Sequence, residues 1–249
     1  MINRLLETKL HIPTWRPEGV QRPHLLARLD ASLSTQHKLT LVSAPAGYGK
    51  TTLLAEWLAH RLESRQPWDA TWLSLDAEDN HPARFWAYWL AALSRVDPAL
   101  GEGARKLLEL PQLAQPAILD ELLNDLATYE GRIVLVVDDY HVMTNPQLYE
   151  GLEYWLDHQP AQVHLAITTR EDPPLPLARM RARGQLTEIR AHDLRFTLDE
   201  AQQFFSQSMH VDLDAEAIDV LERRTEGWAA GLQLAALAMR NLPNRADFM

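Results

Sequence analysis

The sequence contains no cysteine, which excludes a disulfide framework and any metal site built on thiolates. A chain of this kind suits a reducing compartment, so we expect a cytoplasmic location. No run approaches the roughly 18 consecutive apolar residues that a membrane-spanning helix needs. The first residues, MINRLLETKLHIP, also lack the apolar core of a signal peptide. We therefore expect no membrane partner.

Positive charge is also scarce, because 24 lysines and arginines face 34 acidic residues and give a net charge of −10. Nucleic-acid binding through bulk electrostatics needs a basic face, so we expect no direct DNA binding by this chain. The hydrophobic content of 46% is ordinary for a globular protein. A length of 249 residues allows one large domain with a small helical appendage.

The most informative segment is LTLVSAPAGYGKTT, residues 39–52, in which an apolar strand leads into a glycine-containing loop and then a helix. This context matches a Walker A phosphate-binding loop, although Ala44 replaces the first glycine of the usual pattern. Glycines let backbone N–H groups turn towards an anion at the helix N-terminus. A glycine-rich turn before a buried helix is the alternative. The segment predicts an ATP/ADP site with these contacts: Ala46, Gly47, Tyr48, Gly49, Lys50, Thr51 and Thr52.

Two side chains of this loop have predicted roles. Lys50 is expected to reach the β- and γ-phosphates as a catalytic residue, and the Thr51 hydroxyl is expected to bind Mg²⁺. A second motif, RIVLVVDDY at 132–140, is a nearly continuous apolar run that ends in two acids, as in a Walker B strand. Such a run is common by itself, but it gains weight after a Walker A loop. We assign Asp138 to Mg²⁺ and Asp139 to the attacking water as general base.

The segment TTR at 168–170 ends the next expected strand, 163–170. In P-loop proteins with an acid after Walker B, this strand lies between the Walker A and Walker B strands. Arg170 is therefore a candidate catalytic sensor of the γ-phosphate, because a guanidinium binds phosphate in a bidentate manner. The alternative is an arginine that pairs with Glu171 or Asp172 in a surface loop.

The order of the expected elements predicts a three-layer α/β domain with a five-stranded parallel sheet and a following helical lid. The expected strands are 39–42, 70–76, 132–140, 163–170 and 186–191, with helices between them. Residues 97–114 look irregular. A capping box at Thr197 and Glu200 opens a purely helical part. We expect an N-terminal arm at 1–21, a nucleotide-binding domain at 22–195 and a lid domain at 196–249.

Several segments together carry a family resemblance: SAPAGYGKTTL, LSLDAEDN, VLVVDDYH, TTREDPPLPLARMRARGQLTEIRAHDLRFT and GWAAGLQLAAL. Over about residues 8–240 the chain resembles the N-terminal ATPase module of the large LuxR-type, MalT-like transcriptional activators. These are STAND-class P-loop ATPases of the ASCE/AAA-like type. The resemblance implies that Val20, Gln21 and Arg22 line the adenine pocket. It also implies a lid element at Gly227-Trp228-Ala229, where the family's proline is missing and direct nucleotide contact is therefore doubtful.

The resemblance further implies a slow ATPase that serves as a switch between a closed ADP form and a self-associating ATP form. Full-length relatives bind a small-molecule inducer and DNA through a winged-helix domain, a sensor and a helix-turn-helix, none of which is visible in this sequence. One alternative is a nucleotide-binding scaffold with negligible turnover. A housekeeping motor ATPase is a weaker alternative, since no translocating element supports it.

Overall fold

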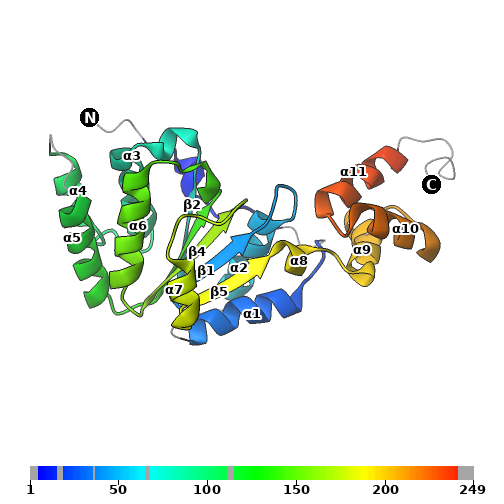
Figure 1. Cartoon of the computed structure of the whole chain (residues 1–249), viewed down its shortest axis with the longest axis horizontal. Helices are drawn as coiled ribbons and strands as arrows, with labels where there is room; N and C mark the ends of the chain where they lie inside the picture. Colours follow the sequence, from blue (N-terminus) through cyan, green and yellow to red (C-terminus); the bar gives the residue numbers. More distant parts are fainter. Residues whose placement is uncertain (1–4, 16–18, 36, 65–67, 111–114, 241–249) are drawn as a thin grey trace.

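The computed structural model describes residues 5–15, 19–35, 37–64, 68–110 and 115–240. At its centre is a five-stranded sheet with the strand order β2-β3-β4-β1-β5, and every neighbouring pair is parallel (Figure 1). The strands are β1 (Leu39–Ser43), β2 (Asp69–Ser74), β3 (Ile133–Asp138), β4 (Val163–Thr169) and β5 (Leu186–Arg190). The predicted fold class is confirmed.

The position of β4 between β1 and β3 is also confirmed. Ser43 pairs in register with Thr169, and Val137 pairs with Ile167, so the carboxyl ends of these three strands lie together. All residues of the three strands are buried, as expected for central parallel strands covered on both faces. The loops that follow β1, β3 and β4 therefore meet at one edge of the sheet.

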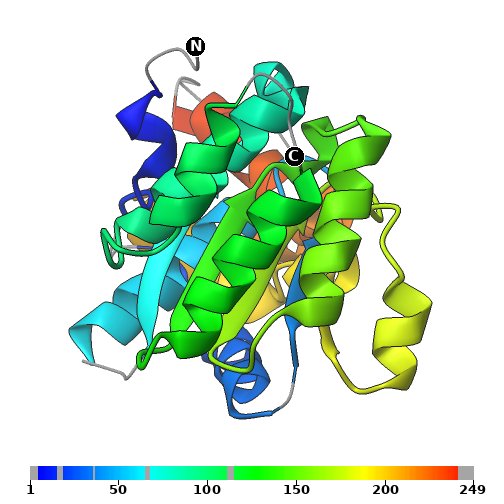
Figure 2. The same cartoon turned by 90° about the vertical axis from the view of Figure 1, so that its left-hand side faces the viewer.

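Helices cover both faces of the sheet. One face packs against α1 (Pro23–Ser34) and α2 (Lys50–Glu63), through the leucines of both helices and the Trp57 indole. The helices associated with the other face form a larger cluster, and α5 and α6 lie across this face in Figure 2. These helices are α3 (Pro82–Ser94), α4 (Glu102–Leu108), α5 (Gln115–Thr128), α6 (Pro146–His158) and α7 (Leu177–Ala182).

One expectation about this region is wrong. Residues 97–114 are not all irregular, because α4 forms within them; residues 111–114 lie outside the described part of the chain. Gly101 starts α4 in a left-handed conformation, and Ala104 and Leu108, four residues apart, are its buried positions. A helix with only two buried apolar positions is too short to show a clear periodic pattern. The helical spacing of the leucines in α2 predicts a buried Leu62, but this residue is 55% exposed near the helix end.

The N-terminal segment is attached to the domain. Its short 3₁₀ helix η1 (Glu7–Leu10) places Leu10 in the larger core. The buried Lys9 amine pairs with Asp79 at 2.5 Å and with Asp76 at 2.6 Å. Burial lowers the pKa of Lys9, but the two carboxylates outweigh that effect and raise it above its ordinary value.

The C-terminal helices have a core of their own, centred on Phe205, Ile218 and Leu232. Figure 1 shows α9–α11 beside the sheet, at the end where β5 leads into α8. The elements are α8 (Ala191–Leu194), α9 (Leu198–Gln203), the π-helical turn η4 (Phe204–Ser208), α10 (Ala215–Thr225) and α11 (Ala229–Arg240). The capping box predicted at Thr197 and Glu200 is present. Residues 241–249 of the predicted lid domain lie outside the described part, and its boundary at residue 196 stays a prediction.

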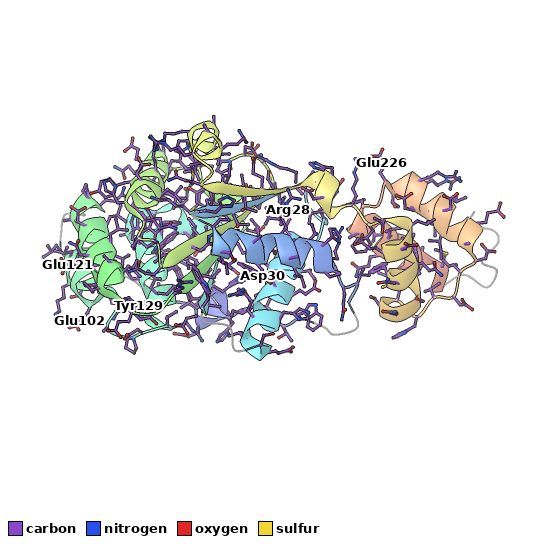
Figure 3. The ribbon with its side chains drawn as sticks, turned by 90° about the horizontal axis from the view of Figure 1, so that it is seen from below. Arg28, Asp30, Glu102, Glu121, Tyr129 and Glu226 are labelled. Carbon is purple, nitrogen blue, oxygen red and sulfur yellow. The ribbon has the colours of Figure 1, made fainter. Side chains whose placement is uncertain are left out.

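Polar contacts fix α1 against its neighbours. Asp30, labelled on α1 in Figure 3, accepts hydrogen bonds from the Trp57 indole at 2.9 Å and from Arg61 at 2.6 Å. Arg28, on the same helix, pairs with Asp193 of α8 at 2.6 Å. These contacts tie α1 to α2 on one side and to the start of the helical part on the other.

Candidate nucleotide site

The loop between β1 and α2 has the backbone that a phosphate-binding loop requires. Gly47 and Gly49 adopt left-handed conformations, with φ of 80° and 77°, and Gly49 is the N-cap of α2. Residues with a Cβ rarely adopt such angles, so glycine is needed at both positions. The N-terminus of α2 therefore opens onto the loop, where the helix dipole favours an anion.

Lys50 lies at the first position of α2, with only 7% of the residue exposed. Its Nζ donates to the carbonyl oxygens of Ala44 at 2.8 Å and Pro45 at 3.0 Å. Burial lowers the pKa of Lys50; Asp139 acts against this, and the positive charge of Arg170 adds to it. The amine thus lies over the loop, where a phosphate can replace carbonyl oxygens as its partner.

Asp138 lies at the end of β3 with its carboxylate buried. The hydroxyl of Thr51 donates to both of its oxygens at 3.0 and 3.1 Å, and that of Thr168 donates to Oδ1 at 2.5 Å. Burial raises the pKa of Asp138, and the bond from Thr168 opposes that rise. The N-terminus of α2 after the loop, the Walker B strand β3 and the strand β4 therefore meet at the carboxylate of Asp138.

These oxygens fit the ligand chemistry of Mg²⁺, which takes carboxylate and hydroxyl oxygens and keeps several waters and phosphate oxygens. Thr51 Oγ1 and Asp138 would hold the ion, as predicted from the sequence. Within the described residues there is no cluster of three or more histidine, aspartate or glutamate side chains that could hold a metal by itself. A magnesium ion here would complete its coordination with nucleotide oxygens and waters.

Asp139 has a different environment from its neighbour. It adopts a left-handed backbone conformation with φ of 59°, and its N–H donates to Thr168 Oγ1 at 2.9 Å. Its side chain is 47% exposed, and Oδ1 lies 3.7 Å from Nδ1 of His141. Burial, with a smaller effect of Arg170, lowers the pKa of His141, which favours a neutral ring at neutral pH. The Asp139 carboxylate therefore faces solvent, where it can accept a proton from water.

Arg170 directly follows β4 and its residue is exposed. In the part of the chain that the structure describes, its side chain forms no hydrogen bond or ion pair. Its charge nevertheless lowers the pKa of both Lys50 and His141, so it acts on the site electrostatically. Asp172, one of the two surface partners considered for Arg170, pairs with Arg190 instead.

A cavity of about 530 Å³ extends from the loop between α2 and the C-terminal helices. Val20 and Arg22, two of the three residues expected at adenine, line it, but Gln21 is exposed and is not among the lining residues. The Arg22 guanidinium is already occupied, because it pairs with Glu200 at 3.0 Å and donates to the carbonyl of Leu194 at 3.0 Å. Its side chain thus links the first helix to the lid.

The C-terminal helices contact the loop directly. The Trp228 indole Nε1 donates to the carbonyl of Ala46 at 3.0 Å, and the N–H of Ala230 donates to the carbonyl of Gly47 at 3.0 Å. A Cβ on Gly47 would lie 2.5 Å from the Cβ of Ala230, so this glycine also permits the close approach. The sequence left direct nucleotide contact by the Gly227-Trp228-Ala229 element in doubt. In the structure Trp228 of this element binds the loop backbone, while contact with nucleotide stays a prediction.

Sequence reasoning missed Thr168 and the Trp228 indole. Thr168 is part of the quoted TTR segment, but only its arginine was singled out; a threonine at the end of a strand beside Walker B was the available signal. Trp228 had no comparable signal, because its partner is a backbone carbonyl distant in the sequence.

No helix in the described ranges has the length and apolar character needed to cross a membrane.

Comparisons with known proteins identify the family of the chain. Residues 19–181 match the family model described as an AAA ATPase domain. The chain is 37% identical over 241 residues to the HTH-type transcriptional regulator MalT of Yersinia enterocolitica, a match that covers 96% of this chain and 26% of the relative. It therefore spans about a quarter of the length of such curated relatives. The resemblance to MalT-like activators is confirmed over this length.

Solved structures share the fold. Cdc6p from Pyrobaculum aerophilum superimposes with a TM-score of 0.57 at 15% identity, over 92% of this chain and 64% of that one. AMPPCP-bound DnaA from Aquifex aeolicus gives a TM-score of 0.50 at 14% identity, over 89% and 62%. At such identities the likeness concerns the fold alone. With the family match, the loop, the acidic pair and the strand order, the chain belongs to the AAA ATPase domain family.

Proposed function

We propose that this chain is the ATP-binding and slowly hydrolysing switch module of a MalT-like transcriptional regulator. The observation that carries the proposal is the direct contact between lid and loop, in which Trp228 and Ala230 bind the carbonyls of Ala46 and Gly47. Phosphates bound to the loop would act on the same backbone that holds the lid. Nucleotide state and lid position are therefore coupled through the same loop backbone.

The chemical part of the proposal assigns each residue a separate task. Lys50 binds the β- and γ-phosphates, and Thr51 and Asp138 would hold Mg²⁺, which would supply positive charge beside the transferred phosphoryl group. Asp139 takes a proton from the attacking water, and its solvent-facing carboxylate supports that role. Arg170 contacts the γ-phosphate and loses that partner after hydrolysis.

The regulatory part concerns the longer protein. In it, ADP maintains a closed form, ATP with a small-molecule inducer favours self-association, and DNA is bound by segments beyond this chain. The charge of −10 supports a module that leaves DNA binding to other domains. A cytoplasmic location remains a prediction. The rival function is a scaffold that binds nucleotide with negligible turnover.

The deciding experiment identifies the nucleotide that copurifies, and then measures thermal stability and phosphate release with Mg²⁺ and ATP or ADP. Ligand at about 100 times its dissociation constant adds roughly 2.7 kcal/mol, or on the order of 5 °C in melting temperature. Lys50→Ala should remove most of the shift, because the phosphates lose their cation. No shift with either nucleotide in the parent protein would refute the nucleotide site. A shift without phosphate release would favour the scaffold.

A further inference from the structure

Glu56 is a buried carboxylate for which the chemistry above has no use. It lies on the face of α2 towards the cavity, and only 2% of the residue is exposed. Its Oε1 is buried and has no hydrogen-bond partner among the described residues. Buried carboxylate oxygens are rarely left unpaired, because a lost partner costs the full desolvation of the group. Such an oxygen in a cavity wall indicates a ligand that brings a donor.

The position of Glu56 identifies the part of the ligand that it faces. Gly47, Gly49 and Thr51 line the end of the cavity at the phosphate-binding loop. Glu56 follows Lys50 by six residues on the same helix. At the α-helical rise this is about 9 Å farther along the axis. A nucleotide with its phosphates at the loop and its remainder extended along α2 would therefore place its nucleoside near Glu56.

The walls of the cavity around this region suit the faces of a flat heterocycle. They include the apolar side chains of Val20, Phe196, Phe204 and Met209. Burial raises the pKa of Glu56, while His60 and the backbone N–H of Arg22 act in the opposite direction. Within this mainly apolar wall, the free oxygen of Glu56 is a polar group that can select among bases.

We propose that Glu56 reads the base, with Oε1 accepting a hydrogen bond from the 6-amino group of adenine. The inference rests on the proposed nucleotide site and adds its specificity. Guanine and hypoxanthine carry a 6-keto oxygen at the same position, and two facing acceptors repel each other. A site built around a specific hydrogen bond rejects analogues that lack the donor, because its own polar group is then left unpaired.

The test measures dissociation constants by calorimetry for four diphosphates: ADP, purine riboside diphosphate without the 6-amino group, inosine diphosphate with a 6-keto group, and 2′-deoxy-ADP. The parent protein should bind ADP roughly ten- to a hundredfold more tightly than purine riboside diphosphate, the range for a hydrogen bond to a charged group. Glu56→Ala should bring these two constants to within about twofold. Discrimination that survives in Glu56→Ala would overturn the inference.

Two further variants keep the result interpretable. Glu56→Gln is nearly isosteric, and its amide can donate to a 6-keto oxygen. It should therefore bring the dissociation constants of ADP and inosine diphosphate closer together, and this result does not depend on whether Glu56→Ala folds. Glu63→Gln changes an exposed glutamate of the same helix and should leave all ratios unchanged. If Glu56→Gln leaves the ratio of the dissociation constants for ADP and inosine diphosphate unchanged, the inference is also overturned.

The outcomes separate this inference from the proposed function. If the parent protein binds none of the four ligands, the nucleotide site itself is refuted. If it binds all four and substitution of Glu56 changes only the ratio between ADP and 2′-deoxy-ADP, the carboxylate contacts ribose and the base-reading role is refuted. The expected result is that Glu56→Ala loses affinity only for ADP and 2′-deoxy-ADP, the two ligands with a 6-amino group.

Discussion

Asp138 and Asp139 are adjacent in the chain, yet the backbone sends their carboxylates to different environments. Asp138 is buried between two threonine hydroxyls, whereas the left-handed conformation of Asp139 turns its carboxylate to solvent. Thr168 enforces the separation, because its hydroxyl donates to the first carboxylate and accepts from the second residue's N–H. The roles proposed for the two residues, metal ligand for Asp138 and base for Asp139, need such separate environments.

Replacing Asp139 with asparagine should separate binding from chemistry. Asparagine tolerates a left-handed backbone, so the loop should keep its shape, but its amide cannot accept the proton of water. We expect ATP to bind with little change and phosphate release to slow at least about tenfold. Single-turnover phosphate release and ATP titration measure the two effects. Equal turnover in parent and variant would place the base elsewhere, while Asp138→Asn should instead weaken the Mg²⁺ dependence of binding.

Arg170→Ala should reduce ATP affinity specifically. The guanidinium is exposed and forms no ion pair within the described residues, yet it acts on Lys50, so a γ-phosphate would be its partner. Loss of a charge-assisted hydrogen bond costs about 1.5–3 kcal/mol, or roughly ten- to a hundredfold in affinity. ADP affinity should change little, and titration of both nucleotides measures the difference.

The matched control for Arg170 is Arg183→Ala. Arg183 is also exposed, but it acts on Lys38, which precedes β1 at the opposite end of the sheet from the loop. This variant should leave both affinities unchanged. If Arg170→Ala weakens ATP and ADP equally, Arg170 is not a sensor of the γ-phosphate.

At the scale of elements, the two loop glycines offer a test of the contact between lid and loop. Both have left-handed φ, but a Cβ on Gly47 would meet Ala230 at 2.5 Å, whereas a Cβ on Gly49 would meet no atom within 4 Å. Gly49→Ala should cost the conformational penalty alone, about 1–2 kcal/mol. Gly47→Ala should cost more and should also speed hydrogen exchange at the Ala230 amide. Equal exchange rates in the two variants would show that the lid does not depend on this contact.

The strands and the motif residues could be predicted because their signals are local. The apolar runs that end at Ser43 and Asp138, and the glycines before Lys50, are visible within short windows of sequence. The missed features depend on partners far away in the chain. Thr168 matters through Asp138, Trp228 through the carbonyl of Ala46, and no window contains both members of either pair.

For the whole molecule, acid should lower stability through a buried histidine. His164 on β4 lies beneath α1, where Nε2 accepts from Thr40 at 2.8 Å and Nδ1 donates to the carbonyl of His37 at 3.1 Å. Burial is the main cause that lowers its pKa from 6.5 to about 4. The unfolded chain therefore binds the proton more readily, and the stability that this difference provides is complete above pH 6.5 and lost towards pH 4.

The expected loss is about 3 kcal/mol, since each pKa unit corresponds to about 1.4 kcal/mol. Urea unfolding of the parent and of His164→Gln across this pH range measures it. The variant should have a flatter dependence above pH 5, where most carboxylates remain ionised. Parallel curves for the two proteins would show that other groups cause the acid sensitivity.

The strand order also determines when the nucleotide loop can form during synthesis. β1 emerges first among the strands, but its hydrogen-bonded neighbours are β4 and β5, the last two. Until residue 190 has left the ribosome, β1 lacks a complete set of partners, and the loop after it has no fixed support. Such long-range pairing makes folding slow and leaves apolar strands exposed meanwhile. A nascent chain that already contains both Walker motifs therefore still lacks the strand pairing that holds the nucleotide loop in place.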